Sequence, residues 1–277
     1  MATVRVFHDG TLTEPRLDHP EGVAVHPDGS LWCGGERGQL YRVAPDGGSR
    51  EVVASTGGFV LGVDIDANDL EHPVYLCDLG HRAVYRYAPS TGLEQVTRGG
   101  ARPFVTPNMV RAAPSGALYV TDSNVQGEPG GGVYRFVQAA PGEPWAGGLW
   151  FDEPLNFANG LAVSEDETCV YVVETFAARV VRIPILPDGG PGPVEVVAKM
   201  PGVLPDGVTL GPDGLLYVGC YEPSQVLRVD PATGAVSVLV ADPTAHLLCH
   251  PTNVAFRGWE LFTANLGRWH LAVVDLT

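Results

Sequence analysis

Four residues with oxygen-bearing side chains stand at the same place in four similar segments of this 277-residue sequence: Glu21, Asn108, Asn159 and Asp206. Carboxylates and amide carbonyls are hard ligands, and the set contains neither His nor Cys. Such a set suits a divalent cation, with Ca²⁺ expected first and Mg²⁺ or Mn²⁺ also compatible. Zn²⁺ would be a less usual occupant, because it prefers nitrogen and sulfur ligands. The alternative is that these are turn residues, since Asn-Gly and Asp-Gly are common turn pairs.

The four positions belong to a sixfold internal repeat. Its segments start 40, 47, 51, 47 and 46 residues apart, at Glu21, Leu61, Asn108, Asn159, Asp206 and Thr252. An aromatic residue in an apolar run follows each start by 10 to 14 residues: Trp32, Tyr75, Tyr119, Tyr171, Tyr217 and Phe262. Repeats of this length with several short strands are typical of β-propellers.

Each repeat contains short apolar runs rich in β-branched and aromatic residues, separated by turn sequences such as His26-Pro-Asp-Gly29. We therefore predict an all-β, six-bladed propeller with four antiparallel strands per blade, formed by residues 1–277 as a single domain. The last repeat has three runs, and we expect the N-terminal run Val4–Phe7 to supply its outer strand and close the ring. A pair of β-sandwiches would explain neither the six copies nor this terminal run.

In a propeller, the repeated first position lies near the axis, on one face of the ring. Glu21, Asn108, Asn159 and Asp206 should therefore converge from four blades. Two carboxylates brought together repel each other and are costly to desolvate, and a bound cation relieves both effects. The fold thus predicts a metal site on the axis.

These residues and their flanking motifs resemble the senescence marker protein/gluconolactonase/regucalcin family of six-bladed propellers. The resemblance covers essentially the whole chain and is carried by His19-Pro-Glu-Gly-Val-Ala-Val25, Thr106-Pro-Asn108, Phe157-Ala-Asn-Gly-Leu-Ala-Val-Ser164 and Leu204-Pro-Asp-Gly-Val208. It implies a divalent cation held by Glu21, Asn159 and Asp206, with Asn108 on the metal, its water or the substrate, and it implies lactone hydrolysis. Sugar lactonases of the family carry an arginine two residues before the third-blade Asn, where this sequence has Thr106.

We expect a gluconolactonase-like hydrolase that opens a lactone or related ester ring. The cation would polarise the carbonyl, and Asp206, as catalytic residue, would accept a proton from the attacking water. Asn108, Thr106, Asn124 and His250 are predicted to contact the substrate. His19 and His250 precede the first positions of their repeats by two residues, so either could assist, although both could simply cap loops.

The connection 123–132 is long and glycine-rich, and it should lie on the same face as the four oxygen ligands. We interpret it as a substrate-facing loop, with a plain surface insertion as the alternative. Aromatic residues in neighbouring loops are candidates for an apolar wall: Phe104, Phe157, Phe176, Tyr221 and Trp269.

Composition excludes several classes of function. With 32 acidic and 17 basic residues, the formal net charge is −15, which disfavours nucleic acids as partners. The sequence has no long uncharged apolar run and no secretory signal at its start, and its five cysteines form no CxxC pair. We therefore expect a cytoplasmic monomer without nucleic-acid or membrane contact, whose partner is a small-molecule lactone.

Other functions remain open at this stage. The propeller could bind metal and ligand without hydrolysis, or could catalyse a cyclisation or isomerisation in secondary metabolism, because the fourth repeat also resembles strictosidine synthase-like propellers. A pure protein-interaction propeller would not need the four oxygen ligands.

Overall fold

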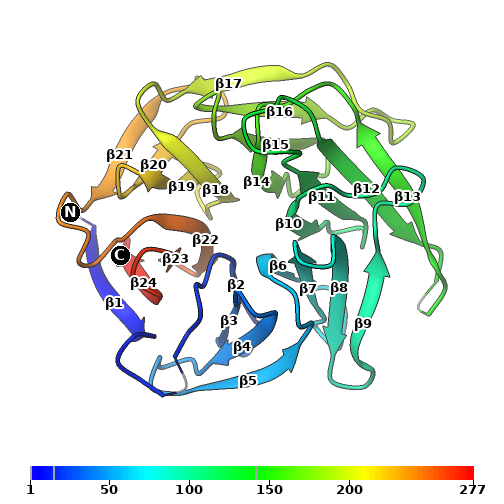
Figure 1. The fold of residues 1–277 in the computed structure, drawn as a ribbon. Coiled ribbons are helices and arrows are strands. Elements are labelled where there is room, and N and C mark those ends of the chain that lie inside the picture. The colour runs from blue at the N-terminus through cyan, green and yellow to red at the C-terminus, as the bar shows by residue number, and fades with distance from the viewer. Residues whose placement is uncertain (1, 15, 141) are drawn as a thin grey trace.

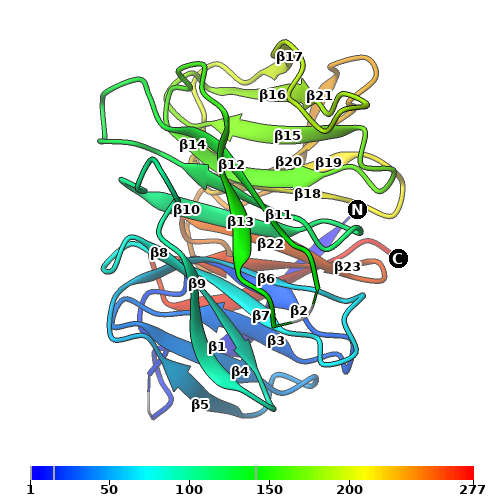
Figure 2. The same cartoon turned by 90° about the vertical axis from the view of Figure 1, so that its right-hand side faces the viewer.

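The computed structural model describes residues 2–14, 16–140 and 142–277. They form six four-stranded antiparallel sheets arranged around a common axis, as predicted (Figure 1). Within these residues the secondary structure is β only, so no helix there could cross a bilayer. Figure 2 shows the ring from the side, with strands running from one face toward the other.

From the axis outward, the strands of the first five blades follow chain order, and the sixth blade runs β22, β23, β24 and then β1. The innermost strands are β2 (Val23–Val25), β6 (Val60–Ile65), β10 (Pro107–Ala112), β14 (Ala158–Val163), β18 (Leu204–Leu210) and β22 (Pro251–Arg257). The second strands are β3 (Leu31–Gly34), β7 (Val74–Asp78), β11 (Leu118–Asp122), β15 (Cys169–Glu174), β19 (Leu216–Glu222) and β23 (Glu260–Asn265). The third are β4 (Gln39–Val43), β8 (Ala83–Ala88), β12 (Gly132–Gln138), β16 (Arg179–Pro184), β20 (Gln225–Val229) and β24 (His270–Asp275). The outer strands are β5 (Arg50–Ser55), β9 (Gly92–Thr97), β13 (Trp145–Phe151), β17 (Glu195–Lys199), β21 (Val236–Ala241) and β1 (Thr3–Asp9).

The N-terminal strand closes the ring, which confirms the expectation for Val4–Phe7. Strand β1 pairs antiparallel with β24, from Thr3 opposite Asp275 to Asp9 opposite His270. The sixth blade is therefore built from both ends of the chain, and the termini lie close together in Figure 1. This pairing joins the first and last segments of the chain without a covalent link.

The apolar core is divided among the six interfaces between blades. Each of six clusters combines buried side chains of two adjacent blades, such as Tyr119 of blade 3 with Leu161 of blade 4. The repeated aromatic residues of the second strands all lie in these clusters, and none is more than 7% exposed. The recurrence of aromatic residues in the sequence therefore reflects the recurrence of the same packing at each interface between blades.

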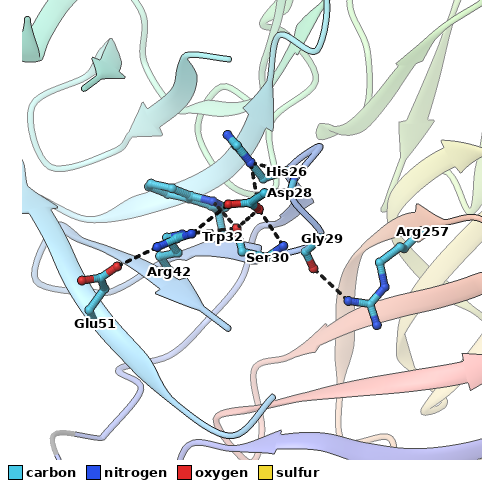
Figure 3. Close-up of polar contacts among 8 residues, drawn as sticks. All are labelled: His26, Asp28, Gly29, Ser30, Trp32, Arg42, Glu51 and Arg257. Atoms are coloured by element: carbon cyan, nitrogen blue, oxygen red, sulfur yellow. Dashed lines mark hydrogen bonds and ion pairs between the residues drawn. The ribbon is translucent and has the colours of Figure 1, made fainter. Parts of the chain in front are cut away.

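A polar network lies in blade 1 at the end of β2 away from Glu21, and one of its hydrogen bonds reaches blade 6 (Figure 3). The Asp28 carboxylate accepts hydrogen bonds from Ser30 N (2.8 Å) and Arg42 Nη2 (2.8 Å). Burial alone would raise the pKa of Asp28, but these bonds hold it well below the usual range. In the same turn, the Gly29 carbonyl accepts a bond from Arg257 Nη1 of blade 6 at 2.8 Å.

The Asn-Gly and Asp-Gly pairs are not turns, so the turn interpretation of Asn159 and Asp206 is wrong. Both pairs lie inside innermost strands, β14 and β18. Their glycines allow neighbouring strands to approach closely at the axis. A Cβ at Gly160 would lie 2.5 Å from Gly207 Cα and 2.6 Å from the Asp206 carbonyl oxygen.

Replacing Gly160 with alanine should therefore destabilise the ring by about 1–3 kcal/mol, because only backbone atoms could give way. The measurement is the free energy of unfolding in urea. Gly148→Ala is the matched control, since its Cβ would meet only the Gly99 carbonyl at 3.6 Å in a strand. Equal stability of the two variants would contradict the close-packing argument.

Candidate functional site

Three of the four oxygen ligands lie on irregularities of the innermost strands. The pairing of the first and second strands shifts register between Pro107 and Val110, between Ala158 and Leu161, and between Pro205 and Val208. Asn108, Asn159 and Asp206 occupy these bulges, which turn a side chain away from the regular alternation of a strand. Glu21 stands two residues before β2 begins at Val23.

The bulged residues and Glu21 line one cavity of about 550 Å³. This confirms the expectation that the four side chains converge on one face. We call the following lining residues the apolar wall: Phe59, Leu61, Leu79, Phe157, Phe176, Leu204, Tyr221 and Leu266. The remaining lining residues are polar: Thr106, Asn124, Gln126 and Thr175.

Three side-chain oxygens at the cavity floor are buried without a donor among the residues that the structure describes: Asn108 Oδ1, Asn159 Oδ1 and Asp206 Oδ1. Buried polar atoms are nearly always hydrogen-bonded, so three unpaired oxygens in one cavity indicate that a ligand binds there. A cation satisfies acceptors that no donor reaches, and the set is all oxygen. The residues present therefore fit a divalent cation held by Glu21, Asn108, Asn159 and Asp206.

The two carboxyl groups of this set are electrostatically strained. Burial raises the pKa of Glu21, and the charge of Asp206 raises it further. Burial also raises the pKa of Asp206, and the neighbouring Asn159 side chain opposes this shift only in part. Ionising both groups is therefore unfavourable in the metal-free protein, and a cation would remove that penalty.

Cation binding should stabilise the protein more at pH 8 than at pH 5. A carboxyl with a raised pKa destabilises the fold progressively as the pH rises from its unfolded value of about 4 through its folded value. A cation offsets this effect and must displace protons to bind. The measurement is the shift in Tm on adding Ca²⁺ at each pH, with Glu21→Gln as the variant expected to reduce the difference. A shift that is equal at both values would contradict the assignment.

Hydroxyl groups of one blade hold the ligand-bearing strand of the next. Thr121 Oγ1 donates to the Asn159 carbonyl at 2.6 Å, and Thr175 Oγ1 donates to the Pro205 carbonyl at 2.8 Å. Thr252 Oγ1 donates to the Glu21 carbonyl at 2.7 Å. These bonds fix the backbone at or next to three of the four ligands.

The Arg111 side chain links the same innermost strands through hydrogen bonds to positions that follow the ligands in sequence. Its Nη1 bonds Asp64 Oδ1 at 2.8 Å, its Nε bonds the Leu161 carbonyl at 2.9 Å, and its Nη2 bonds the Val208 carbonyl at 3.3 Å. Leu161 and Val208 each stand two residues after a ligand, in β14 and β18. One guanidinium on β10 thus links three ligand-bearing strands and β6.

The expected substrate residues Thr106 and Asn124 both line the cavity, beside Asn108. The buried Asp122 carboxylate at the end of β11 accepts their backbone N–H groups, each at 2.9 Å. The connection 123–132 borders the cavity through Asn124 and Gln126, as the substrate-facing interpretation expects. That these residues contact substrate stays a prediction.

His250 supports the wall from behind. Its ring stacks on Tyr221 with centroids 4.5 Å apart, and its Nδ1 lies 2.9 Å from the Tyr221 carbonyl oxygen. A direct contact of His250 with substrate also stays a prediction. His19 is not among the lining residues, and its Nδ1 lies 2.6 Å from Glu36 Oε2.

Two of the five candidate wall aromatics pack elsewhere. Phe104 is in the core of blades 2 and 3, and Trp269 stacks on His19. The sequence interpretation missed three lining residues that stand four positions after the repeated aromatic: Leu79, Thr175 and Leu266. They share that place with Tyr221, which was proposed as a wall aromatic. The constant spacing from the repeated aromatic residue could have identified these positions in the sequence.

A known protein family matches most of the chain. The family model described as the SMP-30/gluconolactonase/LRE-like region matches residues 20–264. YvrE of Bacillus subtilis (strain 168), named a sugar lactone lactonase, is 28% identical over 115 residues. That alignment covers 40% of this chain and 38% of YvrE, so the match spans well under half of the relative's length.

Solved structures share the fold. A gluconolactonase from Xanthomonas campestris superposes with a TM-score of 0.79 at 21% identity, covering 100% of this chain and 90% of that one. Regucalcin from Agrobacterium tumefaciens, described as a calcium-binding protein, gives 0.73 at 18% identity, covering 99% and 94%. At these identities the likeness concerns the propeller architecture.

Proposed function

Because the chain belongs to the SMP-30/gluconolactonase/LRE-like family, we propose that it is a divalent-metal-dependent lactonase. One observation carries the metal dependence: Asn108, Asn159 and Asp206 each present a buried, unpartnered oxygen to the cavity, among the residues that the structure describes. A calcium-binding relative and a gluconolactonase share the architecture, which is consistent with this assignment.

A bound cation would polarise the lactone carbonyl and stabilise the negative charge that develops on its oxygen. Asp206 accepts a proton from the water that attacks the carbonyl carbon. The ring C–O bond then breaks, and the same proton passes to the leaving alkoxide, which gives a hydroxy acid.

Neighbouring residues position the reactants. Asn108 lies beside Thr106 and Asn124, so these three side chains can orient the ester group. Phe157 and Phe176, whose ring centroids are 4.9 Å apart, limit access of bulk water on the fourth blade. Glu21 provides the second negative charge that balances a divalent cation.

The test is hydrolysis of a panel of γ- and δ-lactones, both sugar and aliphatic, followed by proton release. Each lactone is assayed after chelation and after adding back Ca²⁺, Mg²⁺, Mn²⁺ or Zn²⁺ singly. We expect turnover that chelation abolishes and one cation restores. Unchanged turnover in fully metal-depleted protein would overturn metal dependence. Cation binding without turnover of any lactone would favour a propeller repurposed for ligand binding or non-hydrolytic chemistry.

We further propose that the enzyme works as a monomer in the cytoplasm. All five cysteines are free, and four of them are buried, which suits a reducing compartment. Size-exclusion chromatography with light scattering tests the monomer, and fractionation of the source cells tests the location.

A further inference from the structure

We propose that the cavity accepts uncharged lactones bearing an apolar side chain, in preference to polyhydroxylated or anionic lactones. This inference rests on the proposed lactonase function and names its substrate class. The first argument is the wall itself, because half of the sixteen lining residues are Phe, Leu or Tyr. A cavity of about 550 Å³ falls in the size range of small-molecule sites, so a lactone ring and a side chain fit together.

The wall is distributed asymmetrically. Blade 3 contributes only polar residues: Thr106, Asn108, Asn124 and Gln126. Blades 2, 5 and 6 contribute Phe59, Leu79, Tyr221 and Leu266, among other apolar side chains. An ester group oriented toward blade 3 therefore leaves the rest of the molecule against apolar surface.

Charge excludes anionic substrates. Glu21 and Asp206 are the acidic groups on the cavity, and no Arg, Lys or His lines it among the residues that the structure describes. Their two negative charges balance one divalent cation. A carboxylate or phosphate elsewhere on the substrate would be desolvated without a counter-charge, which is strongly unfavourable.

Hydroxyl groups are also poorly accommodated. Each sugar hydroxyl placed against leucine or phenylalanine would lose its bonds to water without gaining a partner. Binding sites reject groups that leave polar atoms unpaired, whereas an alkyl chain gains from the same surface.

The aromatic part of the wall is held rigidly. Phe157 has φ of 63°, a left-handed conformation that is rare for a bulky residue and is retained where surrounding structure demands it. Its ring packs on Phe176, which is 40% exposed at the mouth. Tyr221 is backed by the stacked ring of His250. A preorganised aromatic surface of this kind suits an apolar ligand.

The experiment measures kcat/KM of the cation-loaded enzyme for δ-lactones with 5-alkyl chains of increasing length. A polyhydroxylated δ-lactone and a δ-lactone bearing a carboxylate are assayed beside them. We expect a rise of roughly fourfold per methylene until the cavity is filled, the ratio that corresponds to about 0.8 kcal/mol per buried methylene. The polyhydroxylated and anionic lactones should be at least about tenfold slower than an alkyl lactone of similar size.

Two variants test whether the dependence of kcat/KM on chain length arises at the apolar wall. Phe176→Ser should lower kcat/KM for the longest chain by about tenfold and for the unsubstituted ring by less. Trp259→Ser removes an aromatic of similar exposure (46%) away from the cavity and should change neither value. An equal effect of Phe176→Ser on all lactones would overturn the role of the wall.

The outcomes separate this inference from the proposed function. Cation-dependent hydrolysis with no gain from chain length, or with preference for the polyhydroxylated lactone, overturns the inference alone. If no lactone is hydrolysed, the proposed function fails, and the corresponding 5-alkyl δ-lactams then decide the inference by calorimetry. Affinity that rises with chain length supports the apolar ligand class, and affinity that does not rise overturns it.

Discussion

Replacing Asp206 with asparagine is expected to lower kcat/KM for lactone hydrolysis by about a thousandfold. The variant keeps the size of the side chain but removes the group that accepts the proton of the attacking water, and general base catalysis contributes about 10²–10⁴-fold. It also removes one of the two negative charges that balance a divalent cation. The measurement combines steady-state kinetics with calorimetric titration of the cation.

The metal-free Asp206→Asn protein should be at least as stable as the wild type at pH 8. Asp206 Oδ1 has no hydrogen-bond donor among the described residues, and the charge of Asp206 raises the pKa of Glu21. Removing the charge of Asp206 relieves its repulsion of Glu21, and it breaks no hydrogen bond to Asp206 Oδ1. A merely structural carboxylate would behave in the opposite way. Asp152→Asn, at an exposed position, is the matched control and should leave both activity and stability unchanged. Unchanged kcat in Asp206→Asn would remove Asp206 from the mechanism.

The sequence predicted the fold because a propeller repeats its packing. The aromatic of each second strand fills an interface between blades, so the same residue type must recur at nearly constant spacing. The four oxygen ligands were visible for the converse reason, since they depart from that repetition at one shared position. The lone run Val4–Phe7 was assigned to the last blade because that repeat lacked a fourth strand.

Local sequence could not distinguish a turn from a close approach of strands. Asn159-Gly160 has the same letters as a hairpin turn, yet its glycine makes room for the backbone of Asp206 and Gly207 in the next blade. That contact joins residues 47 positions apart in the sequence, and nothing near Asn159 reveals it. The position of His250 behind Tyr221 is unpredictable for the same reason, because it depends on the path of two loops.

The brace formed by Arg111 was detectable but not recognised. Three residues after each repeat start, the other four segments carry Ala24, Ala162, Thr209 and Ala255, whereas the second and third carry Asp64 and Arg111. Two opposite charges in adjacent copies of an otherwise small position indicate an ion pair near the axis. The partners of Arg111 on blades 4 and 5 are backbone carbonyls, which cannot be identified from side-chain types in the sequence.

Replacing Arg111 with methionine is expected to reduce the free energy of unfolding by about 3 kcal/mol, because it leaves the Asp64 carboxylate without its partner. Both side chains of the pair are largely buried, at 12% and 15% exposure. The double variant Arg111→Met/Asp64→Asn should recover part of this loss. Arg42→Met is the matched control, since Arg42 pairs with Asp28 and Glu51 at the surface and should cost less than about 1 kcal/mol.

The cation affinity of folded Arg111→Met separates a positioning role from a merely stabilising one. Arg111 fixes the carbonyls two residues beyond Asn159 and Asp206, so without it the four oxygens should converge less well and bind Ca²⁺ at least about tenfold more weakly. The double variant should remain weak in cation binding even where its stability recovers, because neither substitution restores the bonds to β14 and β18. Arg111→Lys keeps the charge but not the planar fork of donors, so it should recover stability more than affinity. Wild-type affinity in all three variants would mean that Arg111 stabilises the ring without organising the metal site.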